Sequence, residues 1–105
     1  MNQAEFLELV YRLVRENQQR KALTVLYDYM DRLVFDGQFP QAATVLQIVD
    51  LTRLDSTCIV GFLTVTFSAR EHIPAWAPLQ ERARQACLDR GMPADKVERL
   101  FGEMK

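Results

Sequence analysis

The amino-acid sequence predicts an all-α single domain, built as a stack of about six antiparallel helices. Apolar residues recur at steps of three and four through most of the chain, which places them on one face of successive helices. Single glycines and prolines fall between these amphipathic segments, where helices end and begin. The length of 105 residues, with 49% apolar and 26% charged residues, fits one domain over residues 1–105 with its own core.

Three helices are expected in the first half of the chain. A capping helix spans residues 1–17, and residues 20–49 form a helical hairpin. The first hairpin helix ends at Gly37, because glycine adopts the left-handed conformation that closes a helix. The second begins at Pro40, whose missing N–H costs nothing in a first turn. The inward face of the first hairpin helix is expected to comprise Leu23, Leu26, Tyr27, Met30, Leu33 and Val34.

Residues 57–67 are ambiguous, because their β-branched and aromatic side chains are typical of strands. A helix is favoured, since no other segment offers a partner strand and Asp55 or Ser56 provides an N-cap. The run also continues to Arg70, which is long for a strand. A strand over residues 57–67 stays open as the alternative.

The remaining helices follow from apolar spacing and from glycine and proline boundaries. A helix over residues 78–90 ends at Gly91, so that residues 55–90 form a second hairpin. A short C-terminal helix spans residues 93–104 and opens with a proline. The short connections make neighbouring helices antiparallel.

A weak internal repeat with a period of 34 residues links the two hairpins. Phe39–Pro40 aligns with Ile73–Pro74, and apolar positions meet apolar positions across two copies and part of a third. Within residues 26–49, the chain runs from a turn glycine, Gly37, through an aromatic residue to the small Ala42. This segment resembles the turn and second helix of tetratricopeptide repeats, which have the same period. The resemblance implies a right-handed α-α superhelix in which each hairpin stacks on the next.

The chain also departs from the tetratricopeptide pattern. Met30 and Leu54 stand where the family has a small residue and a closing proline. In the second copy, Glu71 replaces the turn glycine and Trp76 replaces the small residue. The resemblance therefore describes a divergent relative or a convergent helical hairpin.

The chain has few candidate catalytic side chains. His72 is the one histidine, and about 21 Å of helix would separate it from Cys58. A histidine at a helix C-terminus is explained by a favourable interaction with the helix dipole. Asp28 and Asp31 share a helical face without partner carboxylates, and no metal-binding or phosphate-binding motif occurs. The sequence predicts a protein that is not an enzyme and uses no metal or cofactor.

Surface recognition is the remaining source of function. In tetratricopeptide arrays the first helix of each hairpin lines the concave side, so the resemblance implies a groove along the first hairpin helix. Tyr27 and Asp31 lie four residues apart there, an aromatic ring beside a carboxylate that suits a basic peptide or helix. The protein-binding residues that the resemblance implies are Thr24, Tyr27, Asp28, Asp31, Val34 and Phe35. The alternative is that Tyr27 belongs to the core and that Val34 and Phe35 pack on the second helix of the hairpin.

Trp76 is a separate binding candidate. It lies between two prolines, Pro74 and Pro78, and tryptophan is frequent at interface hot spots. The favoured alternative is that Trp76 covers the end of the preceding apolar helix.

Charge and composition restrict the partners and the compartment. The formal net charge is −1, and the basic residues of the C-terminal third alternate with acidic ones, so no nucleic acid is expected as a partner. This holds although residues 90–101 are similar to pentatricopeptide-type repeats, which bind RNA. No secretory signal or membrane-spanning stretch is recognised, and the two cysteines are expected to be buried and reduced, which predicts a cytoplasmic protein.

Together these observations predict a non-catalytic protein–protein interaction module or small adaptor. Its partner is a protein or peptide. The alternative is a homo-oligomeric structural or regulatory helical protein, whose apolar faces are buried against copies of itself.

Overall fold

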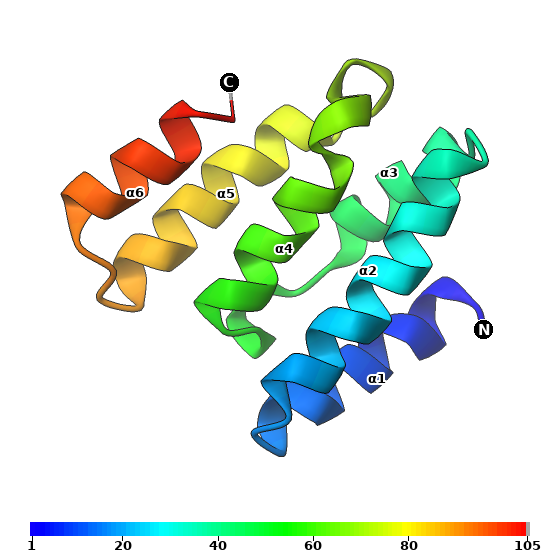
Figure 1. The fold of residues 1–105 in the computed structure, drawn as a ribbon, viewed down its shortest axis with the longest axis horizontal. Coiled ribbons are helices and arrows are strands. Elements are labelled where there is room, and N and C mark those ends of the chain that lie inside the picture. Colours follow the sequence, from blue (N-terminus) through cyan, green and yellow to red (C-terminus); the bar gives the residue numbers. More distant parts are fainter. Residues whose placement is uncertain (105) are drawn as a thin grey trace.

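The computed structural model describes residues 1–104, and within this range the fold is all-α (Figure 1). Six α-helices alternate with short connections, and two 3-10 helices, η1 and η2, lie on either side of the fourth. No helix of the described range is both long enough and apolar enough to cross a membrane. In chain order the elements are α1 (Gln3–Arg15), α2 (Gln19–Phe35), α3 (Phe39–Ile48), η1 (Leu51–Arg53), α4 (Ser56–Thr66), η2 (Phe67–His72), α5 (Trp76–Asp89) and α6 (Ala94–Gly102).

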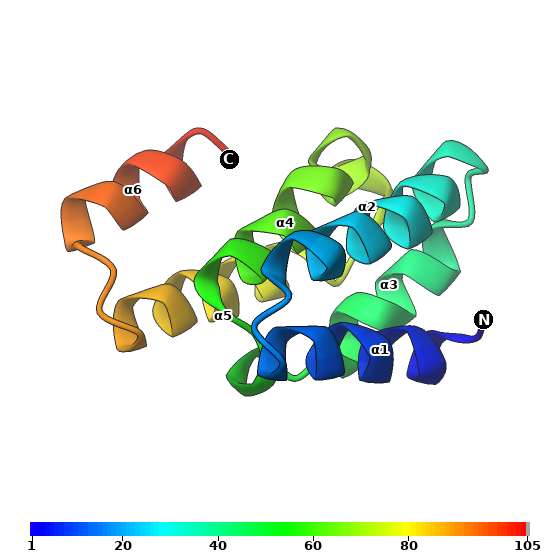
Figure 2. The same cartoon turned by 60° about the horizontal axis from the view of Figure 1, so that its bottom comes forward.

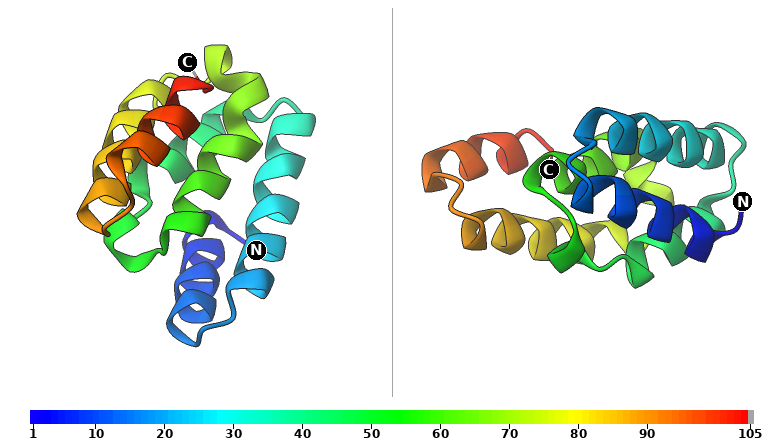
Figure 3. Two further views of the ribbon diagram at one scale, coloured as in Figure 1. Left: turned by 60° about the vertical axis from the view of Figure 1, so that its left-hand side comes forward. Right: turned by 90° about the horizontal axis from the view of Figure 1, so that it is seen from below.

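The α-helices form two layers. Helices α1, α3 and α5 lie in one layer, and α2, α4 and α6 lie in the other (Figures 2 and 3). The chain crosses from one layer to the other at each connection, and α2 contacts α1, α3 and α4. The molecule measures 35 × 34 × 19 Å, and its shortest extent is about two helix diameters. One apolar core therefore lies between the layers.

Three connections share one type of helix ending. Helices α1, α2 and α5 are each followed by a residue with positive φ, namely Asn17 (+59°), Gly37 (+71°) and Gly91 (+88°). In the second of these turns the Gln38 N–H donates to the Leu33 carbonyl oxygen over 2.8 Å, as in a Schellman motif. The predicted stops at Gly37 and Gly91 are confirmed, and Asn17 adds a third turn of the same kind.

The ambiguous segment 57–67 is helical, so the strand alternative is wrong. Helix α4 begins after Asp55, whose side chain accepts a hydrogen bond from the Cys58 N–H over 2.8 Å, as expected of an N-cap. The side-chain amide of Gln19 also donates to the Asp55 carboxylate over 2.7 Å, which ties the start of α2 to the start of α4. At Phe67 the helix tightens into η2 instead of continuing as a regular α-helix.

Two other boundaries differ from the prediction. Helix α5 begins at Trp76, two residues before Pro78, because a proline in the first turn removes an N–H that has no partner within the helix. The 3-10 helix η1 was not predicted, since it is only three residues long. It forms because the Asp50 side chain accepts a hydrogen bond from the Thr52 N–H and starts the turn.

The covered side of α2 is the predicted one except at Tyr27, since Leu26 and Met30 are buried and Leu23, Leu33 and Val34 pack against the core. Tyr27, expected to face inward, is 40% exposed. Tyr29 is the tyrosine of α2 that packs inward, and its ring stacks on Phe6 of α1 with centroids 4.1 Å apart. Helix α4 approaches α2 closely because Gly61 has no side chain, and a Cβ there would lie 3.2 Å from Cδ2 of Leu23. The contacts with α1 and α4 decide which side of α2 is buried.

Candidate interaction surface

The exposed side of α2 carries five of the predicted binding residues. Positions three, four, seven and eleven residues after Thr24 return to nearly the same side of a helix. Phe35 is 88% exposed and Tyr27 is 40% exposed. The sixth residue, Val34, is half-buried against the core. We define the α2 outer face as Thr24, Tyr27, Asp28, Asp31 and Phe35, all of them exposed.

The α2 outer face combines apolar and acidic groups. The Thr24 hydroxyl donates to the Arg20 carbonyl oxygen over 3.0 Å, so its hydrogen is used within the helix. Within residues 1–104, neither Asp28 nor Asp31 forms an ion pair. The two carboxylates therefore remain available to a cationic partner, between two exposed aromatic rings.

A cleft of about 500 Å³ lies beside this face, lined by residues of α2 and by Met1, Gln38 and Gln41, with no residue of α4 among them. Its apolar floor is formed by Val25, Tyr29 and Leu33, which are half-buried. Partial burial raises the pKa of Tyr29 above its ordinary value. Three exposed charged side chains of α2 stand along this cleft, which we call the α2 lateral cleft: Asp28, Arg32 and Asp36.

The sequence interpretation found only Asp28 among the residues of the α2 lateral cleft. The sequence signal for the cleft is a second apolar row on α2, formed by Val25, Tyr29 and Leu33 at steps of four residues. With this row, the apolar surface of α2 is wider than is needed for contacts with one neighbouring layer of helices. The interpretation assigned Leu33 to the core and left the other two residues unassigned.

Trp76 does not belong to an exposed surface. Its side chain is 4% exposed, and the indole N–H donates to the hydroxyl oxygen of Thr66 over 2.8 Å. The Thr66 hydroxyl donates in turn to the Phe62 carbonyl oxygen over 2.6 Å. A tryptophan at the first position of α5 packs inward, because the end of α4 offers it both apolar cover and an acceptor. Trp76 thus covers the end of α4, as the favoured alternative expected, and its expected role as an interface residue is corrected.

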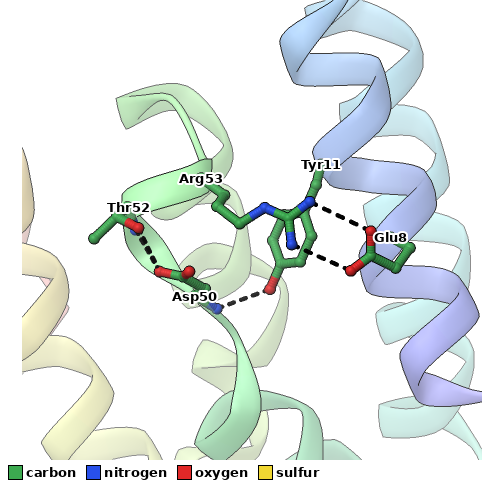
Figure 4. A network of polar contacts seen from close by, with 5 residues as sticks. All are labelled: Glu8, Tyr11, Asp50, Thr52 and Arg53. Carbon is green, nitrogen blue, oxygen red and sulfur yellow. Dashed lines mark hydrogen bonds and ion pairs between the residues drawn. The ribbon is translucent and has the colours of Figure 1, made fainter.

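A polar cluster joins α1 to η1 (Figure 4). The guanidinium of Arg53 donates to both carboxylate oxygens of Glu8, over 3.2 and 3.3 Å, and lies 4.1 Å from the ring centroid of Tyr11. The Asp50 N–H donates to the Tyr11 hydroxyl oxygen over 2.8 Å, and the Thr52 hydroxyl donates to the Asp50 carboxylate over 2.6 Å. Each member has a partner inside the cluster.

The protonation states of this cluster indicate a structural role. Burial raises the pKa of Tyr11 above its ordinary value, against the opposing effect of the Asp50 N–H. Hydrogen bonds from Thr52 lower the pKa of Asp50. Neither group is thereby moved toward neutral pH, where general acid–base catalysis would need it. The cluster fixes α1 to the connection between α3 and α4.

The side chains with catalytic potential lie apart from the cleft. The His72 ring stacks on Phe39 with centroids 4.8 Å apart. Both cysteines are buried and free, and burial raises the pKa of Cys58 to about 12, which keeps it a protonated thiol at neutral pH. Within residues 1–104, no group of three or more His, Cys, Asp or Glu side chains is arranged to hold a metal ion.

Three arginines near the C-terminus are held by contacts within the chain. Arg82 donates to the Leu46 carbonyl oxygen at the end of α3 over 2.9 Å. Arg84 forms ion pairs with two glutamates, and Arg90 donates to the Leu54 carbonyl oxygen over 3.0 Å. These guanidinium groups stabilise contacts between elements and are therefore less available to an external phosphate.

Comparisons with protein-family models, with curated proteins and with solved structures found no match to this chain. The tetratricopeptide resemblance therefore stays a prediction.

Proposed function

We propose that this protein is a non-catalytic interaction module, or small adaptor, that binds a basic amphipathic peptide segment through the α2 outer face. The observation that carries the proposal is the 88% exposure of Phe35, on the same side of α2 as the 40% exposed Tyr27. Fully burying a phenylalanine side chain stabilises by about 1.5–3 kcal/mol, and the fold of this chain leaves that gain unused. Aromatic residues are enriched at interfaces and at their hot spots.

Charge selects the chemistry of the partner. Asp28 and Asp31 lie between the two aromatic rings and form no ion pair within residues 1–104. A segment that places Lys or Arg opposite these carboxylates, with apolar side chains at helical spacing, covers Phe35 and Tyr27 at the same time. An acidic segment would bring like charges together and is disfavoured.

Synthetic peptides test the proposal. One set carries apolar and Lys/Arg residues at helical spacing, and a matched set has Glu in place of every Lys and Arg. Fluorescence anisotropy measures the binding of each set at low and high salt. We expect only the basic set to bind, and its affinity to fall with salt, because exposed charges are screened over about 8–10 Å at physiological ionic strength.

Variants assign the binding to the α2 outer face. We expect Phe35→Ala, and Tyr27→Ala combined with Asp31→Ala, each to weaken binding by about tenfold or more, which corresponds to about 1.4 kcal/mol. Ile48→Ala is the matched control, because Ile48 is 51% exposed but lies on α3 in the other layer. Equal binding of the two peptide sets, or full binding by correctly folded face variants, would refute the proposal.

A self-associating structural or regulatory protein is the second candidate function. The α2 lateral cleft favours it, because apolar side chains there lie beneath a row of charges that form no ion pair within residues 1–104. Contacts within the chain hold the guanidinium groups of Arg82, Arg84 and Arg90, which supports a partner other than nucleic acid.

The buried free thiols fit a reducing compartment such as the cytoplasm.

A further inference from the structure

Helix α2 is the end helix of its layer. Helix α4 lies on one side of it, and within residues 1–104 no helix of the same layer lies on the other side (Figures 1 and 3). The α2 lateral cleft has Val25, Tyr29 and Leu33 as its floor, and no residue of α4 lines it. End units of helical arrays need a polar outer surface or a covering element, because apolar side chains are otherwise left in water.

At the opposite end of the array, ion pairs link the last two helices. There α5 and α6 are linked by Arg84, which forms ion pairs with Glu81 (2.9 Å) and Glu98 (3.2 Å). At the α2 end, an apolar floor lies beside charged side chains that have no ion-pair partner in the described chain.

The charges along the α2 lateral cleft form an alternating row. Asp28, Arg32 and Asp36 are spaced by four residues, or about 6 Å along the helix axis. None of them forms an ion pair within residues 1–104. Because the charges alternate in sign, this row can form opposite-charge pairs with the same row of a second, antiparallel α2.

We infer that a second copy of this chain docks on the α2 lateral cleft, with the two α2 helices antiparallel about a two-fold axis that passes midway between Asp28 and Arg32. In a two-fold interface, residue i contacts residue j while j contacts i. This register places Asp28 opposite Arg32 of the second copy, and Arg32 opposite Asp28 of the second copy. A parallel arrangement would place Asp28 opposite Asp28 and Arg32 opposite Arg32.

The register also matches the apolar floor. Tyr29 is the middle residue of the row Val25, Tyr29 and Leu33, and it lies one residue, or about 1.5 Å along the helix, from the level of the two-fold axis. The long aliphatic stem of Arg32 lies over apolar surface while its guanidinium reaches the carboxylate. The pairing thus covers apolar side chains and satisfies charges in one step.

This inference goes beyond the proposed peptide binding. Asp28 belongs to both surfaces, so Asp28→Arg bears on both proposals. Arg32 lies outside the α2 outer face, so Arg32→Asp tests the dimer separately, whereas Tyr27→Ala and Phe35→Ala test peptide binding.

Light scattering on a sizing column measures the mass of the full chain over a hundredfold range of concentration. The wild type is expected to reach the mass of a dimer. Arg32→Asp alone and Asp28→Arg alone are each expected to be monomeric, because each places two pairs of like charges across the axis. A mixture of these two variants restores two opposite-charge pairs and is expected to form a heterodimer. The double variant with both substitutions also restores them within one chain and is expected to form a homodimer.

Asp36→Arg is the matched control, because Asp36 lies on the same row but outside the paired positions and should leave the dimer intact. All the substituted residues are exposed, and circular dichroism checks that each variant keeps its helices. A wild type that stays monomeric at every concentration would overturn the inference. So would dimerisation by either single variant, or failure of the mixture to pair although the wild type dimerises.

Discussion

The buried hydrogen bond between Trp76 and Thr66 offers a quantitative test of the fold. The indole N–H donates to the Thr66 hydroxyl oxygen over 2.8 Å, and both side chains are buried. Thr66→Val keeps the shape of the side chain but removes the acceptor, which leaves a buried N–H without a partner. We expect a loss of about 1–3 kcal/mol in the free energy of unfolding.

A second variant removes the hydrogen-bond donor of Trp76 and completes a double-mutant cycle between Thr66 and Trp76. Trp76→Phe removes the indole N–H together with part of the ring, with an expected cost of about 1–3 kcal/mol from the lost bond and the space left behind. In this background Thr66→Val no longer strands a donor, so its cost falls below about 1 kcal/mol. The two substitutions should therefore be coupled by about 1–2 kcal/mol, with the double variant more stable than the sum of the single effects predicts.

Urea unfolding followed by far-ultraviolet circular dichroism measures these free energies without depending on tryptophan fluorescence. Thr64→Val is the matched control, because its hydroxyl donates to the Val60 carbonyl oxygen on the exposed side of the same helix. We expect it to change stability by no more than about 0.5 kcal/mol. Additive effects of Thr66→Val and Trp76→Phe would show that the two side chains do not interact. An unchanged stability for Trp76→Phe would contradict the burial of the Trp76 side chain.

Three further predictions concern turns, packing and pH. Asn17→Gly should stabilise the fold by about 0.5–1 kcal/mol, and Gly37→Ala should destabilise it by about 1–2 kcal/mol, because both positions have positive φ. Thermal unfolding measures both changes in stability. Two changes in the same direction would contradict the turn geometry. Gly61→Leu should destabilise by about 1–3 kcal/mol through overpacking against Leu23, whereas Gly61→Ala should stay within about 1 kcal/mol of wild type in the same denaturant assay. Burial alone would raise the pKa of Asp55, but hydrogen bonds from the Cys58 N–H and other donors outweigh it and lower the pKa. The stabilisation that Asp55 provides is therefore fully present above its unfolded-state pKa and is lost as the pH falls through its folded-state pKa. Asp55→Asn should therefore reduce the loss of stability at acidic pH, measured as the free energy of unfolding against pH. An unchanged loss of stability at acidic pH would contradict this prediction.

Local sequence signals were sufficient to predict most of the helices and their ends. Gly37 and Gly91 end their helices because a left-handed turn is a property of one residue and its immediate neighbours. Asp55 caps α4 for the same reason, since a side-chain oxygen reaches an N–H three residues along the chain. These signals outweighed the strand propensity of residues 57–67, where no partner strand was present to pair with.

The candidate surface was predictable in part. The tetratricopeptide resemblance implied Thr24, Tyr27, Asp28, Asp31, Val34 and Phe35, and the structure leaves all of them exposed except Val34. The α2 lateral cleft was missed, because a row of apolar residues does not itself show whether a neighbouring helix covers it.

Tyr27 and Tyr29 show what the sequence alone determined and what it could not. The sequence determined that both lie on one helix, two residues apart and therefore on different sides of it. Tertiary packing decided which one is covered: Tyr29 stacks on Phe6, and Tyr27 remains exposed. Helix formation follows from hydrogen bonds and side chains close in the chain, whereas burial depends on residues far along it that approach only when the layers assemble. Trp76 is likewise buried by tertiary packing, because the end of α4 supplies both a hydrogen-bond acceptor and apolar side chains that cover the indole.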